Sequence, residues 1–408
     1  MGKPKIRFKG YTEEWEQRKV TELGNIYIGL VTTMTAHYTN HGALLIRNSD
    51  IKDGKFEFDT EPIYLDDEFA EANKSRMHKV GDVITVHTGD VGTSAVITKN
   101  EANSIGFATI VTRPNKKILD SYYLSTFLNT DKHKNWAVQM STGDGRTNYN
   151  LREYTELIVP VPTINEQKKI AEYITALNNL ITLHQRKCDE TKKLKKYMLQ
   201  KMFPQNGMKV PEIRFEGFTG DWEQRKLGEL AEIVGGGTPS TSKAEYWDGD
   251  IDWYAPAEIS DKILVDESHR KISDKGFNNS SAKMLPIGTV LFTSRAGIGK
   301  TAILAKEGCT NQGFQSIVPY KDKLDSYFIF SRTEELKKYA ETVGAGSTFI
   351  EVSGKQMSDM NLMMPPTIKE QRIIGEHFKS LDHLIALHQR KCDELVKIKK
   401  YMLQNMFV

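Results

Sequence analysis

Glycine-rich segments are the first places in this sequence where a nucleotide could bind. The run 297–301 (GIGKT) ends like a phosphate-binding loop, but the pattern G-x-x-x-x-G-K-[ST] requires glycine at position 294, which is Ser294. Residues 235–237 (GGG) follow an apolar stretch but lack the G-x-G-x-x-G spacing that leads into the helix of a dinucleotide site. We therefore expect neither segment to bind a nucleotide.

Other catalytic motifs are also missing from the sequence. It contains no G-x-S-x-G, no H-E-x-x-H and no pair of C-x-x-C. Residues 364–367 (MPPT) lack the polar first residue and the aromatic fourth residue of an amino-methyltransferase loop. Residues 166–168 (EQK) could end a nuclease motif, but Glu166 is better assigned to a helix N-terminus. The chain is therefore predicted to have no active site of its own.

Two histidine and cysteine pairs could in principle bind zinc. His184 and Cys188, and likewise His388 and Cys392, are four residues apart, so each pair would lie on one face of a helix. The alternative is a small, slightly polar layer in a helix seam, which fixes register much as a buried asparagine does in coiled coils. We favour the seam layer and predict no metal site.

The chain contains an internal repeat. Residues 4–23 recur with changes as 211–230, and residues 163–203 recur as 367–407 with 26 of 41 positions identical. The middles of the two halves share little. Each half thus has a similar opening, a divergent body and a nearly identical tail, which indicates two different jobs for the bodies and one shared job for the tails.

The tails are predicted to be long helices. Thr163 and Glu166, and Thr367 and Glu370, have the spacing of capping boxes, in which the threonine and glutamate side chains bond the first backbone amides. A heptad seam follows, so each helix needs a long partner, and about 39 residues extend about 58 Å. The other tail is the simplest partner, in antiparallel orientation. The seam residues are Ile174, Leu177, Ile181, His184 and Cys188 in the first tail, and Phe378, Leu381, Ile385, His388 and Cys392 in the second.

The bodies are predicted to be mixed α and β. Short β-rich runs at 82–88 and 289–294 precede glycine-containing turns and then further apolar runs, which is typical of hairpins. Helical stretches follow at 121–129 and 326–341. Each body then passes through a polar, glycine-rich loop just before its tail, a good position for contacts to a ligand.

Composition places the protein among globular proteins of two or three domains. The 408 residues are 39% hydrophobic and 27% charged, and 56 Lys+Arg against 53 Asp+Glu give a net charge of +3, so any electrostatic footprint must be local. Three widely separated cysteines favour a reducing compartment. With neither an apolar leader nor a candidate membrane span, we expect a cytoplasmic protein without membrane contact.

The order of motifs resembles the DNA-specificity subunit of Type I restriction-modification systems. In the second half these motifs are GGTPSTSKAEYWDGDIDWYAPAEI (235–258), the hairpin GTVLFTSRAGIGKTAIL, NQGFQSIVP (311–319), a Gly-Ser-Thr loop and MPPTIKEQ. The first half follows the same order more loosely and lacks GGTP and YW. The resemblance covers essentially the whole chain.

The resemblance implies an α+β architecture: two mixed α/β target-recognition domains joined by two long antiparallel coiled-coil helices, in a pseudo-two-fold internal repeat. Each domain would read one half of a bipartite double-stranded DNA target. Two methyltransferase subunits would bring S-adenosylmethionine, and two restriction or motor subunits would bring ATP and Mg²⁺, so this chain would hold no cofactor. The predicted boundaries are 1–162 (first domain), 163–203 (first spacer helix), 204–210 (linker), 211–366 (second domain) and 367–408 (second spacer helix).

On this interpretation, DNA-contacting residues come from the polar loops of the bodies. Arginine can bond guanine with two hydrogen bonds, asparagine or glutamine can bond adenine, and aspartate can accept from cytosine. A structural coiled-coil adaptor without base-specific readout is the alternative, and it would not need such loops. The candidates are Thr32, Arg47, Asn48, His87, Asp90, Arg146 and Asn148 in the first body, and Thr238, Ser240, Lys243, Arg295, Lys300, Gln312 and Gln315 in the second.

Overall fold

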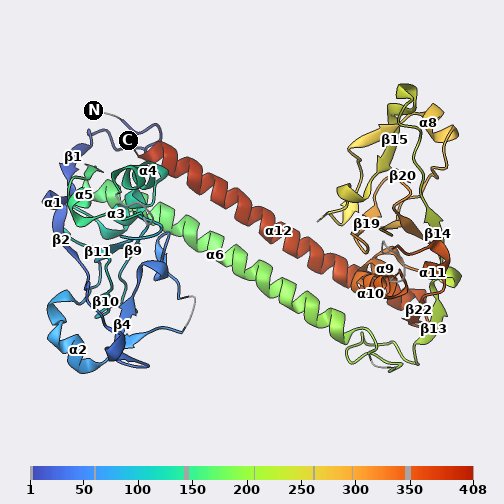
Figure 1. The fold of residues 1–408 in the computed structure, drawn as a ribbon, viewed down its shortest axis with the longest axis horizontal. Coiled ribbons are helices and arrows are strands. Elements are labelled where there is room, and N and C mark those ends of the chain that lie inside the picture. Colours follow the sequence, from blue (N-terminus) through green and yellow to red (C-terminus); the bar gives the residue numbers. More distant parts are fainter. Residues whose placement is uncertain are drawn as a thin grey trace. The chain divides into compact units, whose positions relative to one another are not determined.

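The computed structural model describes residues 3–58, 61–141, 147–205, 207–260, 262–295, 297–344 and 351–407 (Figure 1). The chain divides into two compact units: unit 1 is Met1–Gln185 with Arg390–Val408, and unit 2 is Arg186–Gln389. Each unit contains one body and half of each long helix, α6 (Ile164–Lys201) and α12 (Ile368–Met406). Two mixed α/β domains are thus joined by two long helices, as the sequence predicts.

The body of unit 1 is built on two four-stranded sheets. The first sheet is antiparallel, with strand order β2 (Gly24–Ile28), β11 (Ile110–Pro114), β8 (Val83–Thr85) and β9 (Ser94–Val96). The predicted hairpin at 82–97 is its β8–β9 pair. The second sheet has the order β10 (Ile105–Gly106), β4 (Ala43–Ile46), β7 (Tyr64–Leu65) and β3 (Tyr38–Thr39).

Short helices and strand pairs complete unit 1. They are β1 (Glu16–Lys19) paired with β12 (Ile158–Val161), β5 (Ile51–Lys52) paired with β6 (Lys55–Phe56), and helices α1 (Val20–Leu23), α2 (Asp67–Ala72), α3 (Ser121–Leu128), α4 (Asp131–Met140) and α5 (Leu151–Thr155). Asp120 and Thr130 begin α3 and α4 by accepting hydrogen bonds from the amides of Tyr123 and His133.

The body of unit 2 repeats this plan. Its main sheet has the order β14 (Ala231–Gly235), β21 (Gln315–Pro319), β18 (Val290–Phe292), β19 (Thr301–Leu304) and β16 (Leu264–Val265). A second sheet has the order β17 (Arg270–Ile272), β15 (Trp247–Tyr254) and β20 (Cys309–Thr310). The remaining elements are β13 (Glu223–Lys226), β22 (Asn361–Met364), α7 (Leu227–Leu230), α8 (Asp274–Asn278), α9 (Ser326–Ser331), α10 (Thr333–Gly344) and α11 (Gly354–Ser358).

The start of each long helix corrects one prediction. Thr163 and Thr367 cap as expected, because their hydroxyls accept from the amides of Glu166 at 3.4 Å and Glu370 at 3.2 Å. The glutamate carboxylates do not return to the cap. Buried Glu166 instead forms a two-pronged ion pair with Arg7 at 2.7 and 2.8 Å. A charged, forked donor bonds a carboxylate more strongly than a neutral amide does, so the arginine takes the carboxylate.

The same ion pair is built in unit 2. Arg214 bonds the buried carboxylate of Glu370 at 2.7 and 2.9 Å. Hydrogen bonding to the glutamates raises the pKa of both Arg7 and Arg214. The openings of the two repeats, 4–23 and 211–230, therefore anchor each body to the first turn of the helix that follows it in sequence.

Within each unit the two helices run antiparallel. In unit 1, the Cys392 thiol lies 3.7 Å from Gln185, while Ile170 and Met406 share one core cluster further along. In unit 2, the Cys188 thiol lies 3.9 Å from the Ile385 carbonyl, and Lys195 pairs with Asp382. Of the predicted seam residues, Ile174, Leu177, Cys188, Phe378, Leu381 and Cys392 are buried, whereas Ile181, His184, Ile385 and His388 are partly exposed.

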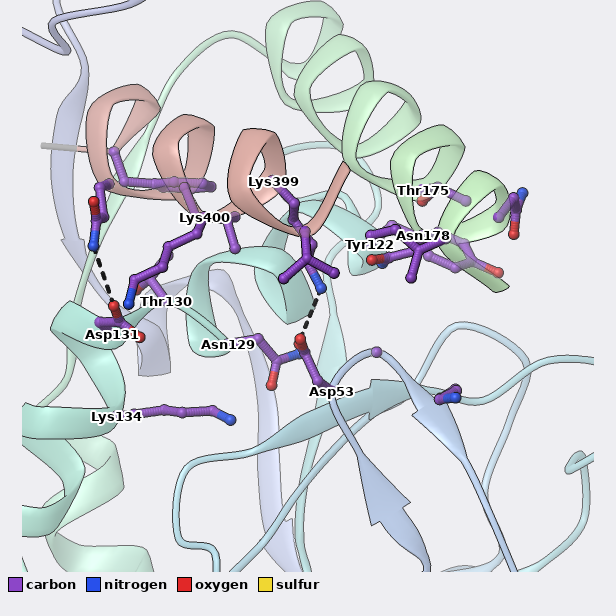
Figure 2. A pocket seen from close by; sticks show the side chains of 18 of the residues that line it. Asp53, Tyr122, Asn129, Thr130, Asp131, Lys134, Thr175, Asn178, Lys399 and Lys400 are labelled. Carbon is purple, nitrogen blue, oxygen red and sulfur yellow. Dashed lines mark hydrogen bonds and ion pairs between the residues drawn. The ribbon is translucent and has the colours of Figure 1, made fainter. Parts of the chain in front are cut away.

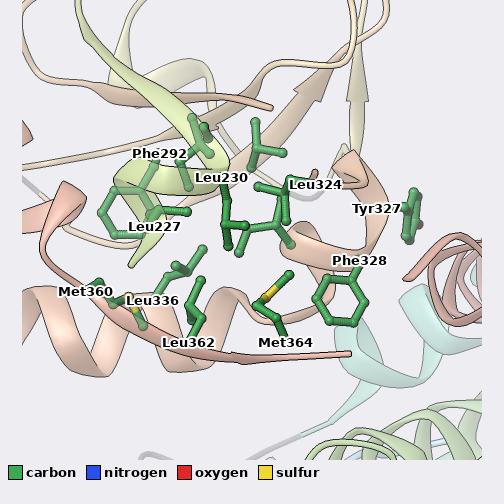
Figure 3. Close-up of a cluster of buried hydrophobic side chains, with 14 of the residues drawn as sticks. Leu227, Leu230, Phe292, Leu324, Tyr327, Phe328, Leu336, Met360, Leu362 and Met364 are labelled. Atoms are coloured by element: carbon green, nitrogen blue, oxygen red, sulfur yellow. The ribbon is translucent and has the colours of Figure 1, made fainter. Parts of the chain in front are cut away.

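The tail of each repeat ends in the core of the body from the other repeat. Phe407 packs against Trp15, Tyr123 and Phe127, with ring centroids 5.6 to 6.2 Å apart. In unit 2, Phe203 packs in the same way against Trp222, Phe328 and Phe378. Figure 3 shows part of this second core, which includes Leu227, Phe292 and Leu362. Each body therefore depends on a side chain that the other repeat supplies.

The described ranges contain neither a candidate metal site nor a candidate membrane span. They hold no group of three or more His, Cys, Asp and Glu side chains placed to share a metal ion. Within them, no helix combines the length and the apolar character that crossing a bilayer requires.

Replacing the aromatic ends of the helices should destabilise one unit at a time. Removing a buried phenylalanine costs about 3 to 5 kcal/mol, because transfer free energy is lost and a cavity remains. We expect Phe203→Ala to lower hydrogen-exchange protection in unit 2, and Phe407→Ala to lower it in unit 1. Tyr197→Ala, an exposed position on α6, is the control. Equal loss of protection in both units from either variant would contradict this assignment of the cores.

Candidate nucleic-acid interface

Polar loops meet at one end of the main sheet of unit 1. Strand β11 is antiparallel to both β2 and β8, and its first residue, Ile110, is paired with Ile28 and Thr85, which end those strands. The loop after β4 joins the same end, because the Phe107 amide bonds the Ile46 carbonyl at 2.9 Å. We call residues 30–32, 47–50, 87–90, 106–108 and 147–149 the first rim.

Three candidates from separate segments come together in the first rim. The Asn48 side chain accepts from the His87 amide at 2.8 Å and donates to the Ala108 carbonyl at 3.2 Å. The His87 ring bonds the Tyr149 carbonyl at 2.7 Å, and Asn148 accepts from the Thr88 hydroxyl at 2.9 Å. These bonds tie the loops to one another, so Asn48 and His87 have a positioning role in this structure.

The remaining candidates of unit 1 differ in how accessible their side chains are to DNA. The Arg47 guanidinium forms a two-pronged pair with buried Asp50 at 2.8 and 3.0 Å, so contacting DNA would require breaking that pair. Asp90 is exposed at the hairpin tip, where it accepts from Thr93 at 2.6 Å, and Thr32 is also exposed. Arg146 lies outside the described residues.

Unit 2 carries a second rim on an equivalent backbone. The Val352 amide bonds the Ser294 carbonyl at 3.1 Å, just as the Tyr149 amide bonds the His87 carbonyl at 2.8 Å. The Gly237 amide bonds the Thr310 carbonyl at 2.9 Å, just as the Leu30 amide bonds the Gly106 carbonyl in unit 1. The second rim comprises residues 237–243, 255–258, 294–295, 297–300, 311–315 and 351–352.

The candidates of the second rim leave more polar groups exposed. Arg295 is partly exposed and has one long ion pair, 3.9 Å from Glu351, while the side chains of Lys300 and Gln312 are exposed. Thr238 donates its hydroxyl hydrogen to Gln312, which brings two candidates together. Gln315 is half-buried on β21, with its side chain near Gly354.

Two further candidates lie on the loop 237–243. The exposed Ser240 hydroxyl bonds Ser242 at 2.9 Å. The Lys243 ammonium bonds the Tyr246 hydroxyl at 3.0 Å and lies 4.9 Å from its ring centroid. This hydrogen bond raises the pKa of Lys243 and keeps it cationic. The loop therefore carries a positive charge at its C-terminal end.

The glycine run 235–237 serves close backbone packing. A Cβ atom on Gly236 would lie 2.1 Å from the Asn311 carbonyl oxygen, and one on Gly237 would lie 2.3 Å from the Ser281 hydroxyl. Both contacts are too short for any side chain. Gly236 and Gly237 are thus required because neighbouring chain passes too close for a Cβ atom, whereas Gly235 has no contact closer than 3.8 Å.

Trp247 and Trp253 position the second rim and were not among the predicted site residues. The Trp253 indole donates to the Gly237 carbonyl at 2.8 Å, and the Trp247 indole donates to the Ser240 carbonyl at 3.2 Å. Their rings meet edge to face with centroids 5.1 Å apart. The segments YW (246–247) and DWY (252–254) are the available sequence signal, and they contribute only to the resemblance.

Unit 1 also contains a pocket of about 650 Å³ between its body and the two helices (Figure 2). Lys399 crosses it to pair with Asp53 at 2.7 Å, and Gln404 bonds Asp131 at 3.4 Å. Lys134 lines the pocket and lies 3.9 Å from Asp90 of the first rim. The pocket therefore adjoins the first rim and carries several lysines.

The family model and the related proteins that match this chain agree with one another. A family model described as "Type I restriction modification DNA specificity domain" matches the chain twice, over residues 12–193 and 219–397. The MjaIX specificity subunit of Methanocaldococcus jannaschii is 35% identical over 193 residues, which span 46% of this chain and 44% of that one. The putative MjaX specificity subunit of the same organism is 25% identical over 95% of this chain and 91% of its own.

Solved structures share the fold over the whole chain. The S subunit of a Type I restriction-modification system from M. genitalium has a TM-score of 0.66 at 14% identity, covering 100% of this chain and 99% of that one. A chain from a structure titled for complex assembly and conformational transition of the type I R-M system has a TM-score of 0.51 at 19% identity, covering 97% and 98%.

A buried histidine beneath the first rim should make the stability of unit 1 depend on pH. His133 bonds the Leu128 carbonyl at 2.6 Å, and burial lowers its pKa to about 4. An unfolded histidine protonates below about pH 6.5, so the stability from neutral His133 is complete above that pH and is lost as the pH falls toward 4, by about 3 kcal/mol. We expect His133→Gln to reduce this pH dependence in denaturant titrations. A profile unaltered by His133→Gln would contradict the prediction.

Proposed function

Because the chain belongs to the Type I restriction-modification DNA specificity family, we propose that its two rims each contact one half of a bipartite double-stranded DNA target. This proposal rests on one observation: the two rims share the same backbone hydrogen bonds but present different side chains. At equivalent positions, His87 and Thr88 in unit 1 are replaced by Ser294 and Arg295 in unit 2.

The differences at the rims favour two different half-site sequences. The Phe107 amide bonds the Ile46 carbonyl in unit 1, and the Asn311 amide bonds the Tyr254 carbonyl in unit 2. In each unit a short turn begins two residues after that carbonyl, at Asn48 and at Pro256. These two residues therefore occupy equivalent positions. Base edges in the major groove are distinguished by their donors and acceptors, so two sets of side chains select two sequences. The target is therefore bipartite and non-palindromic. A structural adaptor without base-specific readout would not need two rims that share a backbone arrangement and differ in their polar side chains.

The proposed role requires no chemistry from this chain. The partners are two methyltransferase subunits that carry S-adenosylmethionine and two restriction or motor subunits that use ATP and Mg²⁺. Partner subunits also supply part of the neutralisation of DNA phosphates, which is consistent with a chain of net charge +3. Binding and selection of the sequence remain the contribution of this chain.

Repeated apolar residues on the helices support two equivalent docking surfaces. Large apolar side chains are exposed at the same repeat positions of both helices: Leu180 and Leu384, Leu194 and Ile398, and Tyr197 and Tyr401. Leu194 and Tyr197 on α6 are three residues apart, as are Ile398 and Tyr401 on α12, so each pair lies on one face of its helix. Neighbouring exposed apolar side chains of this kind mark protein interfaces. A partner that recognises one set recognises the other, so one kind of methyltransferase subunit docks twice.

Arg295→Ala tests sequence-specific readout. We expect the second half-site to lose selectivity at one base pair, by about 1 to 3 kcal/mol, while the first half-site is unchanged. Methylome sequencing of a strain that carries the complex measures both half-sites. Arg225→Ala is the matched control, because this partly exposed arginine on β13 is separated from the rim by the length of β14. Equal weakening on all sequences would make Arg295 a phosphate contact, and a complex without a bipartite methylation pattern would refute the proposed function.

Tyr197→Ala and Tyr401→Ala test the two docking surfaces. We expect each single variant to weaken the binding of one methyltransferase subunit, and the double variant to weaken the binding of both. Light scattering on the copurified complex gives the stoichiometry, with Tyr320→Ala, an exposed tyrosine outside the helices, as the control. A wild-type complex that binds only one methyltransferase subunit would contradict the paired surfaces.

A further inference from the structure

An exposed arginine stacks on the tryptophan pair that positions the second rim. The guanidinium carbon of Arg270 lies 3.7 Å from the ring centroid of Trp247 and 6.0 Å from that of Trp253. We propose that Arg270 reads a guanine in the second half-site. This proposal rests on the proposed function and adds a specificity-determining residue outside the polar loops.

The tryptophan pair is a rigid support for Arg270. Both indoles are buried, and each donates its N–H to a carbonyl of the loop 237–243. Arg270 lies directly across from Trp253 in the register of β17 and β15. Its guanidinium is therefore held in a fixed relation to the loop that carries Thr238 and Ser240.

Stacking leaves the hydrogen-bonding edge of the guanidinium available. A ring contact covers one flat face, whereas the N–H donors point outward in the plane and match the paired acceptors O6 and N7 of guanine. Holding the side chain in place beforehand also reduces the entropy lost on binding.

Two carboxylates that are close to Arg270 in the sequence or across the sheet are paired with other cations. Buried Asp252 on β15 bonds Lys306 at 2.8 Å and lies 3.7 Å from Lys271. Glu267 also lies 3.6 Å from Lys271. Among the residues that the structure describes, Arg270 itself has no carboxylate within ion-pair distance. This distinguishes it from Arg47, whose guanidinium is held by Asp50.

The contribution of Arg270 to base discrimination should be confined to the second half-site. In unit 1, β7 pairs with β4 as β17 pairs with β15 in unit 2, and β7 consists of Tyr64 and Leu65. That strand has no arginine, so in the described part of the first body it presents no side chain equivalent to Arg270.

Two variants at position 270 separate base reading from simple charge. Arg270→Ala removes the side chain, and Arg270→Lys keeps the charge but removes the planar fork. For both we expect the discrimination at one G·C pair of the second half-site to fall by roughly 5- to 150-fold. Methylome sequencing and competition binding by the complex with its methyltransferase subunits measure this. Thermal melting checks the fold, and Arg225→Ala is the control.

The possible outcomes are distinct. A degenerate position in the second half-site with both variants, and an unchanged first half-site, would support the proposal. Uniform weakening on all DNA by Arg270→Ala with a smaller salt dependence, and full rescue by Arg270→Lys, would instead identify a phosphate contact and overturn it. An unchanged motif with Arg270→Ala would also overturn it while leaving the proposed function intact. A wild-type complex without bipartite methylation would refute both.

Discussion

A buried ion pair at the first turn of each long helix fixes how the helix leaves its body. Glu166 and Glu370 are buried, and each carboxylate is satisfied by one forked arginine from the opening of its own repeat. Removing one partner of a buried pair leaves an uncompensated charge at a cost of about 3 to 5 kcal/mol, whereas the intact pair satisfies the charge. The neighbouring glutamines, Gln167 and Gln371, bond backbone groups that precede the helices α3 and α9, so the same turn also holds the rest of the body. The contacts between α6 and α12 within each unit depend on the direction in which each helix leaves its body.

Much of the architecture could be predicted because it follows local patterns. The tails have a heptad repeat and a threonine cap, and the two hairpins have a glycine turn between apolar runs. The pairing of Glu166 with Arg7 could not be predicted, because the capping box is a local pattern and the two residues are 159 positions apart. Local spacing shows which bonds are available, but the tertiary fold decides which of them forms.

The candidate site was predicted less completely for the same reason. Residue type identified polar groups on loops, and the structure brings Asn48, His87 and Asn148 together from three segments. Residue type could not indicate that these groups bond one another, since that depends on the register of β2, β8 and β11. Trp247 and Trp253 contribute to the sequence analysis only through the resemblance. Their contribution to the second rim comes from two indole N–H groups that reach backbone carbonyls.

The exchange of tail ends between the bodies also determines the order in which the chain can fold during synthesis. Phe203 precedes the second body, so it is already present when the strands of that body emerge. Phe407, by contrast, is made after both bodies, as is Asn405, whose carbonyl accepts a hydrogen bond from the Ile6 amide. At about 5 to 20 residues per second, the roughly 245 residues between the end of the first body and Phe407 take about 12 to 50 seconds to synthesise. During that interval the core of the first body lacks the aromatic side chain that packs against Trp15, Tyr123 and Phe127.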